Sequence, residues 1–95
     1  MKSIEGGYIM YNKKRSKEQL RRYYARIAAF SKSDMEYHNT QIYYHMKLQA
    51  EGVKYKPRSS DKTYHGRKAI HALLAYEMCQ KNYFDALEEL EQLYQ

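Results

Sequence analysis

The sequence predicts an all-α fold, a small single-domain bundle of about four helices whose C-terminal pair forms a helical hairpin. Apolar residues recur at three- and four-residue steps along most of the 95 residues. Residues typical of helix starts precede these runs, and no two strand-like segments joined by a turn occur. The length suits one domain, with 1–12 as a flexible N-terminal leader and 13–95 as the helical domain.

The first helix is expected over about 16–31. Ser16 and Gln19 have the spacing of a capping box, in which the two side chains accept hydrogen bonds from exposed backbone N–H groups. The residues that follow at helical spacing form one apolar stripe, expected to face the core: Leu20, Tyr23, Tyr24, Ile27 and Phe30.

A second helix is expected from Ser33 to about 51. Ser33 and Glu36 form another possible capping box, and Gly52 is a natural C-terminal stop. Its apolar residues fall on two sides, one with Met35, Ile42, His45, Met46 and Gln49 and the other with Tyr37, Tyr44 and Leu48. A helix that is apolar on two sides is either central in a bundle or partly committed to a partner.

Residues 53–60 contain the only proline, Pro57, and are expected to form a loop. A third helix is predicted to begin near Asp61, or only after Gly66, and a fourth to begin at Asn82. The apolar residues expected to hold these two helices in the core are Ile70, Leu74, Met78, Phe84, Leu87, Leu90 and Tyr94.

One C-terminal segment carries a family resemblance. The stretch KNYFDALEELEQL, from Lys81 to Leu93, resembles the turn and second helix of a tetratricopeptide-type repeat, with Asn82 and Tyr83 at the turn and Ala86 at the small-residue packing position. The match covers about twenty residues, and no second copy occurs at a 34-residue period. The resemblance therefore implies a helical hairpin, not membership of the family.

Composition predicts a small core supplemented by Tyr and Met. Leu, Ile, Val and Phe together number only fifteen, whereas there are twelve Tyr and five Met. The single Cys79 excludes an internal disulfide and suits a reducing compartment. The sequence shows no apolar signal segment or membrane span, so we expect a cytoplasmic protein without a membrane partner.

The residue pattern does not favour enzyme chemistry, a metal site or a cofactor. His38 and His45 are seven residues apart, two helical turns, instead of the four-residue spacing of helical zinc pairs. Cys79 lies eight residues after His71, too far along a helix for a Cys–His nucleophile pair. The four glycines form no phosphate-binding loop. The histidines beside apolar residues are expected at the edge of the core.

The uneven distribution of charge along the sequence indicates a binding function. The net charge is +6, but residues 1–76 hold sixteen Lys and Arg against six acids, whereas 77–95 hold one Lys against five acids. Cations before a helix start do not stabilise the helix, so the run from Lys13 to Arg26 favours an anionic partner. The first hypothesis is a small basic protein that binds DNA, RNA or a nucleic-acid-handling complex. Its predicted contacts are Lys13, Lys14, Arg15, Arg21, Arg22, Arg26, Lys54, Lys56, Arg58, Arg67 and Lys68.

The alternative is a protein-binding adaptor or inhibitor, for example a phage or mobile-element product that acts on a host protein. Tyr, Arg and Met are enriched at protein interfaces, and twelve tyrosines exceed what one small core holds. The interface candidates are Tyr37, Tyr44, Tyr55 and Tyr64. A host protein that itself binds nucleic acid would satisfy both hypotheses, and the two-sided second helix also allows a homodimer.

Overall fold

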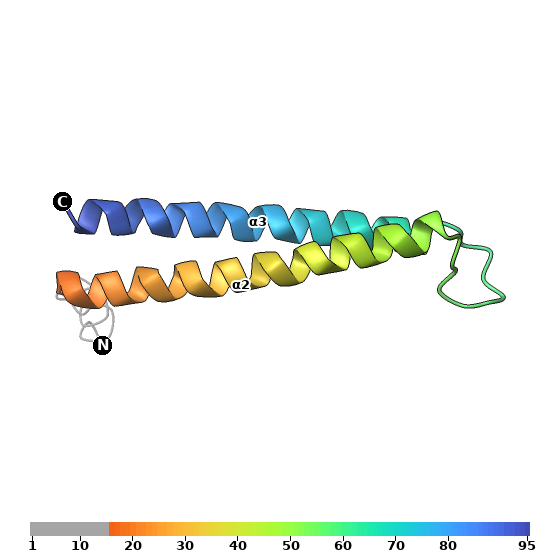
Figure 1. The fold of residues 1–95 in the computed structure, drawn as a ribbon, viewed down its shortest axis with the longest axis horizontal. Helices are drawn as coiled ribbons and strands as arrows, with labels where there is room; N and C mark the ends of the chain where they lie inside the picture. Colours follow the sequence, from red (N-terminus) through yellow and green to blue (C-terminus); the bar gives the residue numbers. More distant parts are fainter. Residues whose placement is uncertain (1–15) are drawn as a thin grey trace, which may run out of the picture.

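Residues 16–95 are described by a computed structural model, in which two long helices form an antiparallel hairpin (Figure 1). Helix α2 spans Lys17–Ala50, 34 residues, and helix α3 spans Tyr64–Leu93, 30 residues. The non-helical segment 51–63 joins them at one end of the molecule, and the C-terminus lies beside the start of α2 at the other.

The predicted four-helix bundle is wrong because the two expected N-terminal helices are one. The backbone of α2 continues through Ser33 and Glu36, which therefore form no capping box. No glycine or proline occurs between Lys17 and Ala50, so nothing interrupts the ladder of backbone hydrogen bonds. Serine caps a helix only at its N-terminal start, and Ser33 lies in the interior of α2.

The predicted third and fourth helices are likewise one helix. Asn82 lies inside α3 and does not cap it, and Lys81 pairs with Asp85 one turn later, with 2.8 Å between Nζ and Oδ2. The turn implied at Asn82 and Tyr83 by the tetratricopeptide-like segment is therefore absent from α3. The hairpin that the chain does form has its turn at 51–63.

The local signals at the helix ends are confirmed. The Ser16 hydroxyl accepts a hydrogen bond from the Gln19 backbone N–H at 3.1 Å, and the Gln19 side chain accepts one from the Ser16 N–H at 3.0 Å. Gly52 has φ +74°, the left-handed conformation that ends many helices. The loop predicted at 53–60 lies within the observed connection. The predicted leader at 1–12 lies outside the described residues.

Helix α3 is capped from α2. Thr63, at its N-cap position, makes no side-chain capping hydrogen bond. The Gln49 side chain instead accepts a hydrogen bond from the Gly66 backbone N–H at 2.8 Å and donates one to the Lys62 carbonyl, also at 2.8 Å. Since free N–H groups at a helix start need an acceptor, Gln49 links the two helices at the loop end.

Where α2 and α3 face each other, both follow a seven-residue repeat typical of coiled coils. We call this contact the seam, and each residue in it is buried or half-buried. In α2 it consists of Arg21, Tyr24, Ala28, Ser31, Met35, His38, Ile42, His45 and Gln49, and in α3 of His65, Ala69, Ala72, Tyr76, Cys79, Tyr83, Ala86, Leu90 and Leu93. Steps of three and four alternate throughout, so one face of each helix stays against the other.

The core differs from the expected one. The buried residues of the described chain are small or polar: Ala28, Ser31, His65, Ala69, Ala72 and Ala86. No large side chain among residues 16–95 is fully buried. Of the predicted supplement of Tyr and Met, Tyr24, Met35, Tyr76 and Tyr83 lie half-buried in the seam, between small residues that let the two helices approach. The residues assigned to the core at Phe30, Ile70, Leu74, Met78 and Phe84 are exposed.

The hairpin is thin and long. Its longest dimension is 59 Å and its shortest 13 Å. The radius of gyration is 20.2 Å, whereas a compact chain of this length would have about 12 Å. The shape leaves most side chains outside the seam in contact with solvent.

Candidate functional site

Helix α2 carries a second apolar stripe beside the seam. Its nine positions again alternate steps of three and four residues, and we call it the aromatic stripe. It consists of Leu20, Tyr23, Ile27, Phe30, Asp34, Tyr37, Gln41, Tyr44 and Leu48. Each stripe residue directly precedes a seam residue, so at 100° per residue the centre of the stripe is turned by about 100° from the centre of the seam. The stripe thus lies on one flank of the hairpin.

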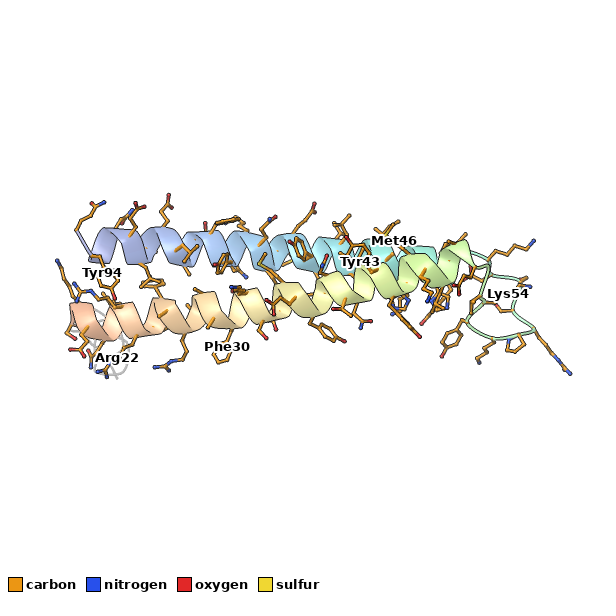
Figure 2. All side chains as sticks on the ribbon, in the orientation of Figure 1. Arg22, Phe30, Tyr43, Met46, Lys54 and Tyr94 are labelled. Carbon is orange, nitrogen blue, oxygen red and sulfur yellow. The ribbon has the colours of Figure 1, made fainter. Side chains whose placement is uncertain are left out.

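The rings of the aromatic stripe recur every seven residues and are exposed to solvent. The exposed fractions are 43% for Tyr23, 65% for Phe30, 60% for Tyr37 and 55% for Tyr44. Figure 2 shows Phe30 pointing away from α3. A regular row of exposed rings along the flank of a helix is a candidate interaction surface.

Some of these rings are oriented by neighbours on α2. Tyr37 meets His38 edge-on with 5.3 Å between ring centroids, and Tyr44 meets His45 edge-on at 5.1 Å. Since His38 and His45 belong to the seam, these contacts connect the exposed rings to the interface between the helices. His38 and His45 are half-buried, in agreement with the position at the edge of the core that the sequence predicts.

Helix α3 has an apolar row on the other flank. Ile70, Leu73, Phe84 and Tyr94 are exposed there. At the loop end, an open groove of about 390 Å³ runs between this row and α2. It is lined by Ile42, Met46, Gln49, Ala50, Gly66, Ala69, Ile70 and Leu73. This row is interrupted by Glu77, Gln80 and Glu91 and is less apolar than the aromatic stripe.

The two predicted basic sets lie at opposite ends of the hairpin. Figure 2 shows Arg22 near the start of α2 and Lys54 at the far end, in the loop. The helical rise of 1.5 Å per residue separates them by roughly 40 Å. The described residues of the two sets therefore do not form one continuous face. Lys13, Lys14 and Arg15 lie outside the described residues.

In the first basic set, two arginines have partners within the chain. The Arg21 Nη2 donates a hydrogen bond to the Leu93 carbonyl at 2.8 Å, and its guanidinium lies over the Tyr94 ring, 4.6 Å from the centroid. Arg22 pairs with Glu18 at 2.6 Å on the exposed surface. Arg26 is exposed. Arg21 thus ties the C-terminal end of α3 to α2.

The loop end gathers the second basic set with two predicted tyrosines. The Tyr55 and Tyr64 rings lie 4.5 Å apart, with the Lys56 Nζ 5.7 Å from the Tyr55 centroid and the Lys68 Nζ 5.8 Å from the Tyr64 centroid. Lys54 is half-buried and Arg58 is exposed. The aromatic pair brings loop and helix together, with cations on both sides.

Arg67 is committed to the structure of the loop. It pairs with the Asp61 carboxylate, which also accepts hydrogen bonds from the Thr63 backbone N–H at 2.8 Å and the Thr63 hydroxyl at 2.9 Å. The hydrogen bonds from Thr63 first, and then the Arg67 guanidinium, hold the pKa of Asp61 below its ordinary value. Asp61 is therefore a charged acceptor that organises the turn before α3.

The sequence predicts Tyr37 and Tyr44 as interface residues and Tyr23 and Phe30 as core residues. The structure places all four in one exposed row. A signal for this row is present in the sequence, because the four rings stand seven residues apart at 23, 30, 37 and 44. A division into two helices at Ser33 would separate Tyr23 and Phe30 from Tyr37 and Tyr44, whereas the continuous α2 aligns all four.

No family model, curated protein or solved structure matches the chain. Within residues 16–95, neither helix has a stretch that is both long and apolar enough to cross a membrane. Over the same residues, no three His, Cys, Asp or Glu side chains are grouped so that they could hold a metal ion.

Proposed function

We propose that the protein works without catalysis, by binding another protein through the aromatic stripe of α2. The observation that carries this proposal is the row of rings at Tyr23, Phe30, Tyr37 and Tyr44, each at least 43% exposed. Monomeric proteins seldom leave an ordered apolar row of this length in water, and large rings are the residues that contribute most at protein interfaces.

The distribution of charge supports a protein partner over nucleic acid. The two described basic sets are far apart, and Arg21, Arg22 and Arg67 already bind groups of the chain itself. A nucleic acid would have to compete for these cations, whereas Phe30, Tyr37 and Tyr44 already expose more than half of their surface. The free thiol of Cys79, half-buried in the seam, is compatible with work in the reducing cytoplasm.

Affinity capture from an extract of the source cells tests this function. Wild-type protein and the Phe30→Glu, Tyr37→Glu and Tyr43→Glu variants serve as bait. Tyr43 is the matched control, since it is 68% exposed on α2 but lies about 120° around the helix from the stripe. We expect a specific protein that survives nuclease treatment, is retained by Tyr43→Glu and is lost with the two stripe variants. The proposal would be contradicted if the stripe variants captured the same protein as the wild type, or if nuclease treatment abolished the capture.

Nucleic-acid binding at the loop end is a second candidate function. Residues 47–68 hold seven Lys and Arg against two acids, and the Tyr55–Tyr64 pair lies among them. Cations interleaved with aromatic rings bind single strands by phosphate contact and base stacking. This candidate keeps the function first expected from the sequence, but confines it to one end of the hairpin.

A titration of DNA and RNA at two salt concentrations tests the second candidate. Binding that needs phosphate contacts loses affinity steeply as salt rises, with a slope of roughly 0.7–0.9 per contact. We expect a triple variant, Lys54→Ala, Lys56→Ala and Arg58→Ala, to reduce both affinity and slope. The control, Arg22→Ala with Arg26→Ala, changes the distant set. Absence of binding at about 50 mM salt would exclude this function.

A further inference from the structure

We propose that the partner of the aromatic stripe is a second copy of this chain, with the α2 helices of the two copies antiparallel. This inference rests on the proposed function, which it deepens by naming the partner. It follows from the repeat of the stripe, the position of its polar residues, its charge and its area.

The aromatic stripe has the sequence pattern of a coiled-coil seam. Its nine positions, from Leu20 to Leu48, alternate steps of three and four residues without interruption, as the seam toward α3 does. Seven of the nine residues are aliphatic or aromatic. A helix with two such seams is typical of one that has two helical neighbours, and α3 supplies only the first.

The polar residues of the stripe select the antiparallel direction. A parallel pair in register would place Asp34 directly against Asp34 of the second copy, and like charges at such a position are destabilising. In an antiparallel pair with Ile27 against Tyr44 of the second copy, Asp34 lies against Tyr37 of the second copy. A phenol hydroxyl there donates a hydrogen bond to the carboxylate, so the polar position is satisfied.

Charge along α2 favours the same direction. Residues 17–33 hold five Lys and Arg and one acid, whereas 34–50 hold one Lys and two acids. Antiparallel pairing places the basic half of each copy beside the acidic half of the other. It also separates the two basic loops, which a parallel pair would bring together at one end.

The four exposed rings provide about half of the area that a standard dimer interface takes from each copy. An aromatic side chain buries 150–250 Å², so four half-exposed rings provide roughly 400 Å² per copy. A standard interface takes about 800 Å² from each partner. Leu20, Ile27 and Leu48 extend the same stripe and supply part of the remainder.

The mass in solution, measured by light scattering after size-exclusion chromatography, is the first test. We expect the wild-type protein to be a dimer. The Phe30→Glu and Tyr37→Glu variants should raise the dissociation constant of the dimer at least tenfold, and the Tyr43→Glu control should not. A monomeric wild type, or a dimer that tolerates both stripe substitutions, would overturn the proposal.

Cross-linking decides the direction and does not depend on disruptive variants. Two chains, Gln19→Cys and Lys47→Cys, are prepared in a Cys79→Ser background and mixed with a short bismaleimide. Both substituted residues are exposed on the same edge of the stripe, and within one chain they are about 40 Å apart. We expect cross-links between a Gln19→Cys chain and a Lys47→Cys chain. Cross-links between two Gln19→Cys chains, or none at all, would overturn antiparallel pairing.

The two experiments also separate this inference from the function on which it rests. A monomer that still captures another protein through the stripe would overturn self-pairing and leave the proposed function intact. A dimer with the expected cross-links that captures no other protein would support self-pairing and show that the binding function is limited to self-association. A monomeric protein that also captures no other protein would overturn both proposals.

Discussion

His45 of α2 and His65 of α3 face each other across the seam, with their Nδ1 atoms 2.9 Å apart and their rings stacked at 5.1 Å between centroids. One Nδ1 must donate a proton and the other must accept it, so the contact requires at least one neutral ring. His65 is only 7% exposed, which keeps solvent away from one side of the pair. The hydrogen bond joins the helices near the loop end.

Acidification should weaken the hairpin through this pair. Burial first, and then the charges of His65 and Lys68, lower the pKa of His45 from its ordinary value of 6.5. The unfolded chain therefore binds a proton at higher pH than the folded chain does. The stability that depends on neutral His45 is complete above about pH 6.5 and is lost as pH falls through the lower folded pKa.

Urea unfolding at pH 7.5 and pH 5 measures this effect. We expect a lower midpoint at pH 5 for the wild type and a smaller difference for His45→Gln. The exposed His71→Gln variant is the control and should keep the wild-type difference. A midpoint that rises on acidification, or a pH dependence unchanged by His45→Gln, would contradict the role of the pair.

Arg21 should contribute to stability, whereas its neighbour Arg22 should not. Arg21 is half-buried, binds the Leu93 carbonyl and lies over Tyr94, whereas Arg22 makes an exposed ion pair with Glu18. We expect Arg21→Ala to lower the free energy of unfolding by about 1–2 kcal/mol. Arg22→Ala should change it by less than about 0.5 kcal/mol. Equal effects of the two substitutions in urea unfolding would be inconsistent with Arg21 as the tie between the helix ends.

Gln49 should behave as a helix cap although it lies on the other helix. Its side chain accepts a hydrogen bond from the Gly66 N–H and donates one to the Lys62 carbonyl. Removing such a cap costs about 1 kcal/mol, so Gln49→Ala should destabilise the hairpin by that order. Hydrogen exchange would localise the loss, because the first amides of α3 should exchange faster. Faster exchange confined to α2 would speak against this role.

Replacing a small residue of the seam by a larger one should destabilise the hairpin. Ala28 is 7% exposed in the seam, and Ala29, the next residue, is exposed. We expect Ala28→Leu to cost about 1–3 kcal/mol, because the larger side chain pushes the helices apart. Ala29→Leu should stay within about 0.5 kcal/mol of the wild type. Thermal unfolding of the pair measures the difference, and a stabilised Ala28→Leu variant would refute close packing at the seam.

The features predicted correctly from the sequence are those that depend on neighbouring residues. The Ser16–Gln19 box, the stop at Gly52 and the loop around Pro57 are set by local backbone chemistry. Ser33 and Asn82 were misinterpreted because serine and asparagine are accepted inside a helix as well as at its start. Whether Ser33 and Asn82 start a helix or lie inside one depends on the long contact between α2 and α3. That contact belongs to the tertiary structure and cannot be read from neighbouring residues.

The candidate site was predicted in part for a similar reason. Periodicity shows that α2 has two stripes, but not which of them faces α3. Tyr37 and Tyr44 were assigned to an interface, whereas Phe30 was assigned to the core, although all three share the aromatic stripe. In the structure, Ala69, Ala72 and Ala86 of α3 are buried in the seam, whereas Phe30, Tyr37 and Tyr44 of α2 are exposed.

The thermal midpoint of the wild-type protein across a range of concentrations is the most direct test of pairing along the aromatic stripe. Unfolding that is coupled to dissociation depends on concentration by mass action. If two copies of α2 pair, the midpoint should rise by several degrees between about 5 and 500 µM protein. A midpoint that stays constant over this range would show that the hairpin folds as a monomer and would contradict the pairing.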